Sequence, residues 1–284
     1  MLLTIHVGGT SYFSASRIGR LRHSFHQHPL LQIAALEQLA TERDPLRLRR
    51  FVRPGLTQAS GFPPDVQHHE DQSFEEAFHR IEEPDSRVAL FNVKILPRYR
   101  KLLREILESV HEQVEQEQPD IFLEMRFVFI SAPFSVTPFH INRENNFQLQ
   151  PQGRKAANVW PHADNTVMPA TTVEQFIVAH SFEKVHFKEE LWVRNEEFEV
   201  RPGDGVYFPS TSPHMRRSDQ GWIAPGDGVS MSFGVNYYTS TTRHTPHATR
   251  HTTRVHQSNY VMIKKLKLSP AVPSETTKSF SERY

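Results

Sequence analysis

Three polar side chains, His140, Asn142 and His214, have types and a spacing that suit metal chemistry. Alternate side chains of an extended strand share a face, so His140 and Asn142 are predicted to point the same way. His214 follows residues 202–213, which are typical of a turn, a strand and a loop, and a sheet can bring it beside the first strand. Two imidazoles and one oxygen ligand leave three positions of an octahedral metal open, as in non-heme Fe(II) oxygenases.

This pattern is weak when taken alone, because the chain contains 17 histidines and one metal site uses only a few of them. Lys155, two residues after Gly153, is equally ambiguous by itself. A lysine beside a glycine turn is ordinarily a solvated side chain. A function therefore depends on what surrounds these residues.

The surrounding residues, 129–160 (FISAPFSVTPFHINRENNFQLQPQGRKAANVW), resemble the JmjC, cupin-like hydroxylase family. The family pattern is T-P-x-H-x-D, then N-F, then G-x-K before a strand. This chain has TPFHIN at 137–142, NF at 146–147 and GRK at 153–155. Residues 202–214 resemble the strand that carries the distal histidine, and 235–238 resemble a later strand that contributes an asparagine. The pattern is most similar to the branch of the asparaginyl hydroxylase that acts on hypoxia-inducible factor.

The resemblance implies two cofactors, Fe(II) and 2-oxoglutarate, and a role for four further residues. Lys155 would pair with the distal carboxylate of 2-oxoglutarate, because an ammonium neutralises it. Thr137 would hydrogen-bond the same carboxylate. Asn146 and Asn236 would orient this cosubstrate through their amides.

The metal site departs from the family at one position. The resemblance implies His140 and His214 as ligands, but Asn142 stands where the family has Asp. A carboxamide offers only a neutral carbonyl oxygen, so Fe(II) affinity is expected to fall. Glu144 does not replace the carboxylate, since it lies two residues further on, roughly 6–7 Å away in a strand.

Two functions stay open at this point. The first is an Fe(II)- and 2-oxoglutarate-dependent hydroxylase that acts on a protein side chain or a small molecule. The second is a non-catalytic, cupin-like module with a degenerate metal site that binds a small acid or a partner protein. Asn142 favours the module, whereas Lys155, Thr137 and His214 favour the hydroxylase.

The fold that must position these residues is predicted to be mainly β with flanking helices. The resemblance implies a double-stranded β-helix, the cupin or JmjC jelly-roll barrel, with a helical N-terminal region and a C-terminal helix. Runs rich in β-formers and bounded by turn residues predict strands at 127–131, 139–142, 147–150, 156–160, 197–200, 205–208 and 229–238. Apolar spacing predicts helices at 30–40, 73–81 and 173–178, and one from Pro97 to Pro119.

Three regions follow from the changes in composition. Residues 1–120 are expected to form a mixed N-terminal region, 121–240 the barrel core, and 241–284 a basic helix and flexible tail. Residues 260–268 are a candidate homodimer contact, by analogy with related barrels. The His- and Arg-rich segment 243–256 favours a basic helix face or an arm over a metal site. The two PGDG segments, at 202–205 and 225–228, predict hairpin corners.

Composition excludes several other classes of protein. The absence of cysteine among 284 residues rules out disulfides, iron–sulfur clusters and thiol catalysis. A net charge of +1 argues against a nucleic-acid binder. The first residues resemble no signal peptide, and no apolar run reaches the roughly 18–20 residues that span a membrane. We therefore expect a cytoplasmic protein without membrane contact.

Overall fold

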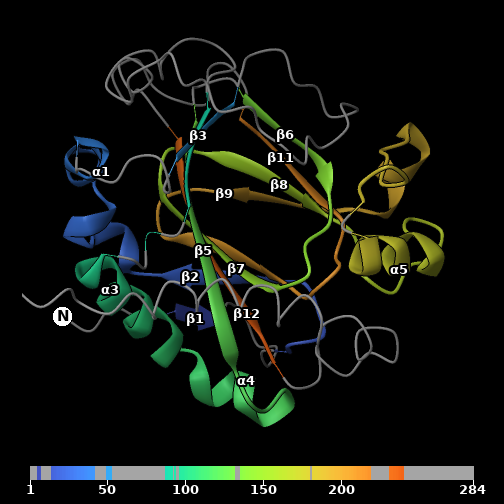
Figure 1. Ribbon diagram of the computed structural model, residues 1–284, viewed down its shortest axis with the longest axis horizontal. Helices are drawn as coiled ribbons and strands as arrows, with labels where there is room; N and C mark the ends of the chain where they lie inside the picture. Colours follow the sequence, from blue (N-terminus) through green and yellow to red (C-terminus); the bar gives the residue numbers. More distant parts are fainter. Residues whose placement is uncertain are drawn as a thin grey trace, which may run out of the picture.

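Two antiparallel sheets form the body of the molecule (Figure 1). The computed structural model describes residues 5–7, 14–41, 49–52, 87–91, 93, 96–131, 135–179, 181–218 and 230–239. The large sheet has the order β1 (Ile5–Val7), β2 (Gly19–His23), β10 (Asp204–Phe208), β7 (Asn145–Gln152), β12 (Ser230–Tyr238), β5 (Phe122–Ser131), β4 (Arg87–Phe91), β3 (Arg49–Val52). The small sheet has the order β6 (Ser135–His140), β11 (His214–Ser218), β8 (Lys155–Val159), β9 (Glu196–Val200).

Helices cover the outer face of the large sheet, where the main core lies. They are α1 (Ile33–Thr41), α3 (Pro97–Glu108) and α4 (His111–Glu117), preceded by the short 3-10 turns η1 (Phe25–Gln27) and η2 (Pro29–Leu31). Every second residue of a strand faces the same side, and the apolar residues of β7, Phe147 and Leu149, join the helices in this core. The alternate residues of the same strand face the small sheet and are polar: Asn146, Gln148 and Gln150.

The two sheets meet in a small apolar cluster. Val206 and Phe208 of β10 pack against Val159 of β8 and Phe198 of β9. Antiparallel Cα partners share a face of their sheet, so this cluster identifies the inner face of each strand. The other face of the small sheet packs against α5 (Ala170–Ala179) and η5 (Glu189–Arg194), with Trp160 at the centre of that separate cluster.

The predicted fold class is confirmed, since the chain is mainly β with flanking helices. No strand pair among the described residues joins the two sheets. Most predicted strands occur within a few residues of their expected bounds, and so do the helices at 30–40 and 173–178. The long helix is two helices, because Ser109 and Val110 form a turn between α3 and α4. The PGDG segment at 202–205 contains a turn, in which Gly203 has φ of 91°. The prediction of a hairpin corner there was wrong, because β9 and β10 on either side of the turn belong to different sheets.

Other predictions fall outside the described residues: the helix at 73–81, the corner at 225–228, the segment 243–256, the C-terminal helix and the dimer contact. The three region boundaries stay predictions. Strands β1 to β4, from the N-terminal region, pair into the same sheet as the strands of the expected core. No helix in the described part of the chain is long and apolar enough to cross a membrane.

A buried histidine beside the turn at Gly203 makes stability depend on pH. His23 lies at the end of β2, and its Nε2 is 3.0 Å from the carbonyl oxygen of Asp204. Burial, with a smaller effect of the neighbouring His26, lowers the pKa of His23 to about 4. His23 is therefore protonated near pH 6.5 in the unfolded chain, but only near pH 4 in the folded chain.

We expect the free energy of unfolding to fall as the pH drops from 6.5 towards 4, by about 3 kcal/mol from this residue. His23→Gln keeps a donor for the Asp204 carbonyl but does not titrate. Chemical denaturation at pH 7 and pH 4 should therefore give a smaller loss for the variant than for the wild type. Equal losses would mean that His23 titrates normally in the folded protein.

Candidate functional site

The two histidines of the sequence pattern lie side by side. His140 ends β6 and His214 begins β11, and their Cα atoms are directly opposed partners. The centroids of the two imidazole rings are 4.0 Å apart, with an angle of 53° between the rings. Both side chains are buried, with 6% and 1% of their surface exposed. Residues far apart in the chain are therefore brought together at one end of the inner face of the small sheet.

Hydrogen bonds fix which nitrogen of each ring carries the proton. Nδ1 of His140 is 2.8 Å from the carbonyl oxygen of Pro138, and Nδ1 of His214 is 2.9 Å from that of Ser212. A carbonyl only accepts, so each Nδ1 donates, and in a neutral ring the lone pair is then on Nε2. A backbone carbonyl on the second nitrogen is the usual arrangement of metal-binding histidines.

The Nε2 atom of His214 is buried without a partner in the part of the chain that the structure describes. Burial, and then the nearby His140 and Arg216, hold the pKa of His214 well below its ordinary value, so the ring is neutral at pH 7. A neutral imidazole with a buried, unpartnered nitrogen fits a metal ligand.

A β-bulge makes this juxtaposition possible. Between β6 and β11, Thr137 is opposite Arg216 and His140 is opposite His214, so three steps on β6 match two steps on β11. In a regular strand, two residues three positions apart, such as Thr137 and His140, would face opposite sides of the sheet; the bulge puts them on the same side. The bulge contains Pro138, which β6 accommodates because it is an edge strand of the small sheet among the described residues.

Asn142 lies beyond the end of the strand. The prediction of a strand at 139–142 was wrong in its bounds, since β6 ends at His140 and residues 141–144 form the connection to β7. The amide of Thr211 donates to the carbonyl oxygen of Asn142 at 2.8 Å. The side-chain Nδ2 of Asn142 donates to Oδ1 of Asn146 at 3.4 Å, which leaves its own Oδ1 for a further partner.

Asn146 and Asn236 lie next to each other on the large sheet. They are opposed partners of β7 and β12, and both are buried. Asn146 is also the partner of Phe208, whose ring centroid is 4.4 Å from that of His214. The predicted asparagines therefore belong to the part of the large sheet that faces the histidines.

Three rows of side chains describe the inner face of the small sheet. A row here is a set of Cα partners on neighbouring strands. The histidine row is His140, His214 and Val159, and the middle row is Thr137, Arg216 and Ala157. The lysine row contains Lys155, which lies two residues before Ala157 on β8. Lys155 is 3% exposed, so the predicted ammonium is buried on the same face as the two imidazoles.

The large sheet has matching rows. Asn236, Asn146 and Phe208 are opposed partners, and so are Gly234, Gln148 and Val206. Gln150 lies two residues further along β7, and its side chain faces the small sheet as well. Because the ring of Phe208 contacts the ring of His214, the row of Asn236, Asn146 and Phe208 lies opposite the histidine row.

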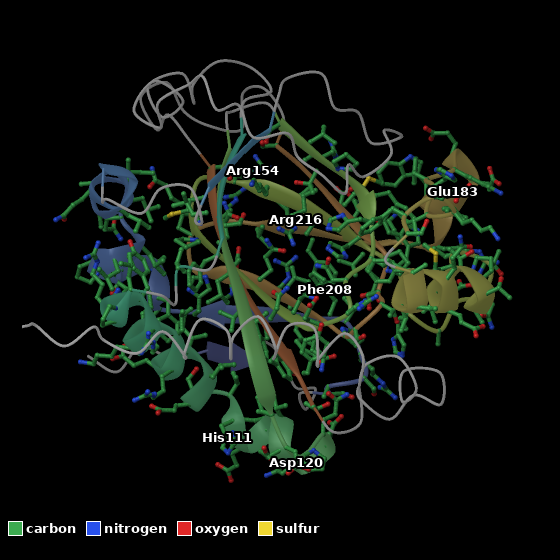
Figure 2. The ribbon with its side chains drawn as sticks, in the orientation of Figure 1. His111, Asp120, Arg154, Glu183, Phe208 and Arg216 are labelled. Carbon is green, nitrogen blue, oxygen red and sulfur yellow. The ribbon has the colours of Figure 1, made fainter. Side chains whose placement is uncertain are left out.

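Sequence reasoning missed two residues of these rows, Arg216 and Gln148. Arg216 lies two residues after His214 on β11 and is buried, and Figure 2 labels it in the middle of the molecule. No strand was predicted at 214–218, so the shared face of His214 and Arg216 went unnoticed. Gln148 follows the N-F motif directly at 146–147, and the strand predicted at 147–150 contained it.

Glu144 is engaged elsewhere, as expected. The hydroxyl of Tyr238 donates to its Oε1 at 2.7 Å. Burial raises the pKa of Glu144, although Tyr238 and Arg143 oppose the shift. Among the described residues, no group of three His, Cys, Asp or Glu side chains could hold a metal. Asn142 is the residue that the sequence pattern offers as a third ligand beside the two histidines.

Comparison with known proteins identifies the fold but no family. No family model matches the chain, and no curated protein matches it. An X-ray structure of Escherichia coli ycfD matches with a TM-score of 0.51 and 14% identity, over 99% of this chain and 65% of that one. A crystal structure described as the Escherichia coli ribosomal oxygenase YcfD matches with a TM-score of 0.50 and 15% identity, over 98% and 64%.

The chain thus spans slightly less than two thirds of the length of the structures that it matches. Identity this low carries the fold alone. The branch of the asparaginyl hydroxylase and the roles of the site residues stay predictions. The comparisons and the geometry together establish that this chain shares its fold with the matched structures and has two buried histidines opposed on its inner face.

Proposed function

We propose that this protein is a 2-oxoglutarate-dependent oxygenase that holds Fe(II) between His140 and His214. The observation that carries the proposal is the opposed pair of imidazoles, each with Nδ1 donating to a backbone carbonyl, together with the buried Nε2 of His214, which has no partner among the described residues. Lys155, buried on the same inner face, supports the proposal because it supplies a positive charge for a dicarboxylate.

The chain's own residues would bind and orient the cosubstrate. The ammonium of Lys155 would pair with the distal carboxylate of 2-oxoglutarate, and the Thr137 hydroxyl would donate to the same group. The amides of Asn146 and Asn236 would orient the end of the molecule near the histidines. Phe208 would exclude water from that end, because its ring covers His214.

Asn142 would complete the metal site through its carbonyl oxygen. Its Nδ2 is engaged by Asn146, so Oδ1 is the atom left for coordination. When bound, Fe(II) would supply the activation of O2 that accompanies decarboxylation of 2-oxoglutarate. The substrate would be a protein side chain or a small molecule. A protein substrate is the first to test, because one of the matched structures is a ribosomal oxygenase.

A second function is supported by the departure at Asn142. With a neutral amide in place of the family's carboxylate, the same residues would form a module that binds a small acid without oxidising it. Lys155, Thr137 and Asn236 would serve this function equally well, because none of them depends on the metal.

Turnover of 2-oxoglutarate separates the two functions. The full-length protein is incubated in air with Fe(II) and 2-oxoglutarate, and succinate is measured. We expect succinate to form only when Fe(II) is present, and to be absent with His214→Ala. Binding of 2-oxoglutarate without any succinate would favour the module, and absence of binding would contradict the oxygenase.

A further inference from the structure

The strongest unexplained group in the described part of the chain is the side chain of Gln148. It lies in the middle of β7, opposite Val206 on one side and Gly234 on the other. Val206 belongs to the cluster between the sheets, so Gln148 faces the small sheet as well. Only 5% of Gln148 is exposed, so water from the bulk solvent does not reach its amide freely.

Neither end of this amide has a hydrogen-bond partner among the described residues. Both Nε2 and Oε1 of Gln148 are buried and unbonded. Buried amides in folded proteins are almost always hydrogen-bonded, because loss of water without a replacement is unfavourable. A buried amide with both ends open therefore indicates a group that the protein binds.

Gln150 shows what the same side chain does when its role is structural. It lies two residues further along β7, on the same face, and is buried to a similar degree. Its Nε2 donates to Ser230 Oγ at 2.9 Å and to the carbonyl oxygen of Gln152, and the hydroxyl of Ser232 donates to its Oε1 at 2.7 Å. The strand thus satisfies one inward glutamine fully and leaves its neighbour open.

The position of Gln148 relates it to the proposed cosubstrate. Gln148 lies two residues along β7 from Asn146, a step of roughly 7 Å. Its partner on β10, Val206, packs in one cluster with Ala157 of the middle row and Val159 of the histidine row. A dicarboxylate that extends from the histidine row to Lys155 would pass the row that contains Gln148. Every polar atom of ionised 2-oxoglutarate is an acceptor, and Nε2 of Gln148 is a donor.

We propose that Gln148 binds the distal carboxylate of the dicarboxylate, from the side opposite Thr137 and Lys155. This inference rests on the proposed function and names a further binding residue for it. Nε2 donates to a carboxylate oxygen, and Oε1 accepts from a water molecule that is ordered beside the ligand. Gln148 thereby selects 2-oxo acids that carry a second carboxylate.

The test compares Gln148→Met with Gln150→Met in the full-length protein. Methionine has nearly the same length as glutamine but no hydrogen-bonding groups. We expect Gln148→Met to unfold at the same temperature as the ligand-free wild type or higher, because an unsatisfied amide is removed. We expect Gln150→Met to unfold at a lower temperature, because Ser230 and Ser232 lose their partner.

Affinity is then measured by calorimetry with Mn(II) and two probes, 2-oxoglutarate and 2-oxopentanoate, which has a methyl group instead of the distal carboxylate. We expect Gln148→Met to weaken the binding of 2-oxoglutarate about tenfold, because one charge-assisted hydrogen bond is lost. The affinity for 2-oxopentanoate should stay unchanged. The preference for the dicarboxylate should therefore fall by the same factor.

Three results would overturn the inference, and they have different meanings. Unchanged affinity of Gln148→Met for 2-oxoglutarate would overturn the role of Gln148 while the proposed function stands. A lower unfolding temperature of ligand-free Gln148→Met would show that its amide is already satisfied in the folded chain. A wild-type protein that binds neither probe would overturn the proposed function, and this inference with it.

Discussion

Replacing Asn142 by Asp will tighten the binding of Fe(II) or Mn(II) by about tenfold or more, because a charged oxygen ligand replaces a neutral one. The variant restores the residue that the resembled family has at this position. Calorimetric titration of the full-length protein with Mn(II), and with Fe(II) under anaerobic conditions, measures the change. Asn165→Asp is the matched control, because Asn165 is exposed and adds the same charge outside the site.

The gain should appear only when metal is present. In the ligand-free protein Nδ2 of Asn142 donates to Oδ1 of Asn146, and an aspartate would place two acceptors against each other. We therefore expect Asn142→Asp without metal to unfold at a lower temperature than the wild type, and metal to raise that temperature more in the variant. Equal metal affinity of the variant and the wild type would remove Asn142 from the ligands.

Replacing Lys155 by Met will weaken the binding of 2-oxoglutarate by about 10- to 100-fold, which corresponds to the loss of a charge-assisted interaction of about 1.5–3 kcal/mol. Methionine fills similar space in the buried position at the start of β8 without the positive charge. Calorimetry with Mn(II) present measures the affinity.

Lys188→Met serves as the control, because its side chain is 67% exposed on the other side of the small sheet from the histidine pair. We expect it to leave the affinity for 2-oxoglutarate unchanged. Tight binding by Lys155→Met would mean that another cation of the inner face, with Arg216 as the first to test, holds the distal carboxylate.

The mainly β fold and the convergence of the two histidines were accessible from sequence, because motifs with a characteristic spacing indicated them. The resembled pattern contains both strands that hold His140 and Lys155, and the fold that it implies was confirmed as mainly β. The helix after Pro97 was equally accessible, because an apolar face at helical spacing decides burial locally, and Tyr99, Leu103 and Ile106 are all buried.

The position of Asn142 could not be derived, because it depends on where β6 ends. The alternation rule treats His140 and Asn142 as neighbours on one face, but β6 ends at His140. The bulge between Thr137 and His140 was not predicted either, because a bulge is defined by the partner strand and β11 was not recognised as a strand. The turn that ended the strand earlier than expected is held by the backbone of Thr211, far along the chain.

Gln148 and Arg216 were missed for a related reason. A buried arginine or glutamine looks like a solvated residue in a sequence, and only the register of β7, β10 and β11 reveals which face each one occupies. Whether an amide is satisfied depends on side chains from other strands, as the contrast between Gln148 and Gln150 shows.

A crystal structure of the full-length protein with Mn(II) and 2-oxoglutarate tests the central claim most directly. We predict a metal ion bound by Nε2 of His140 and Nε2 of His214, with the distal carboxylate of 2-oxoglutarate against Lys155. A fully occupied cosubstrate elsewhere, or two imidazoles without metal between them at saturating Mn(II), would contradict the account.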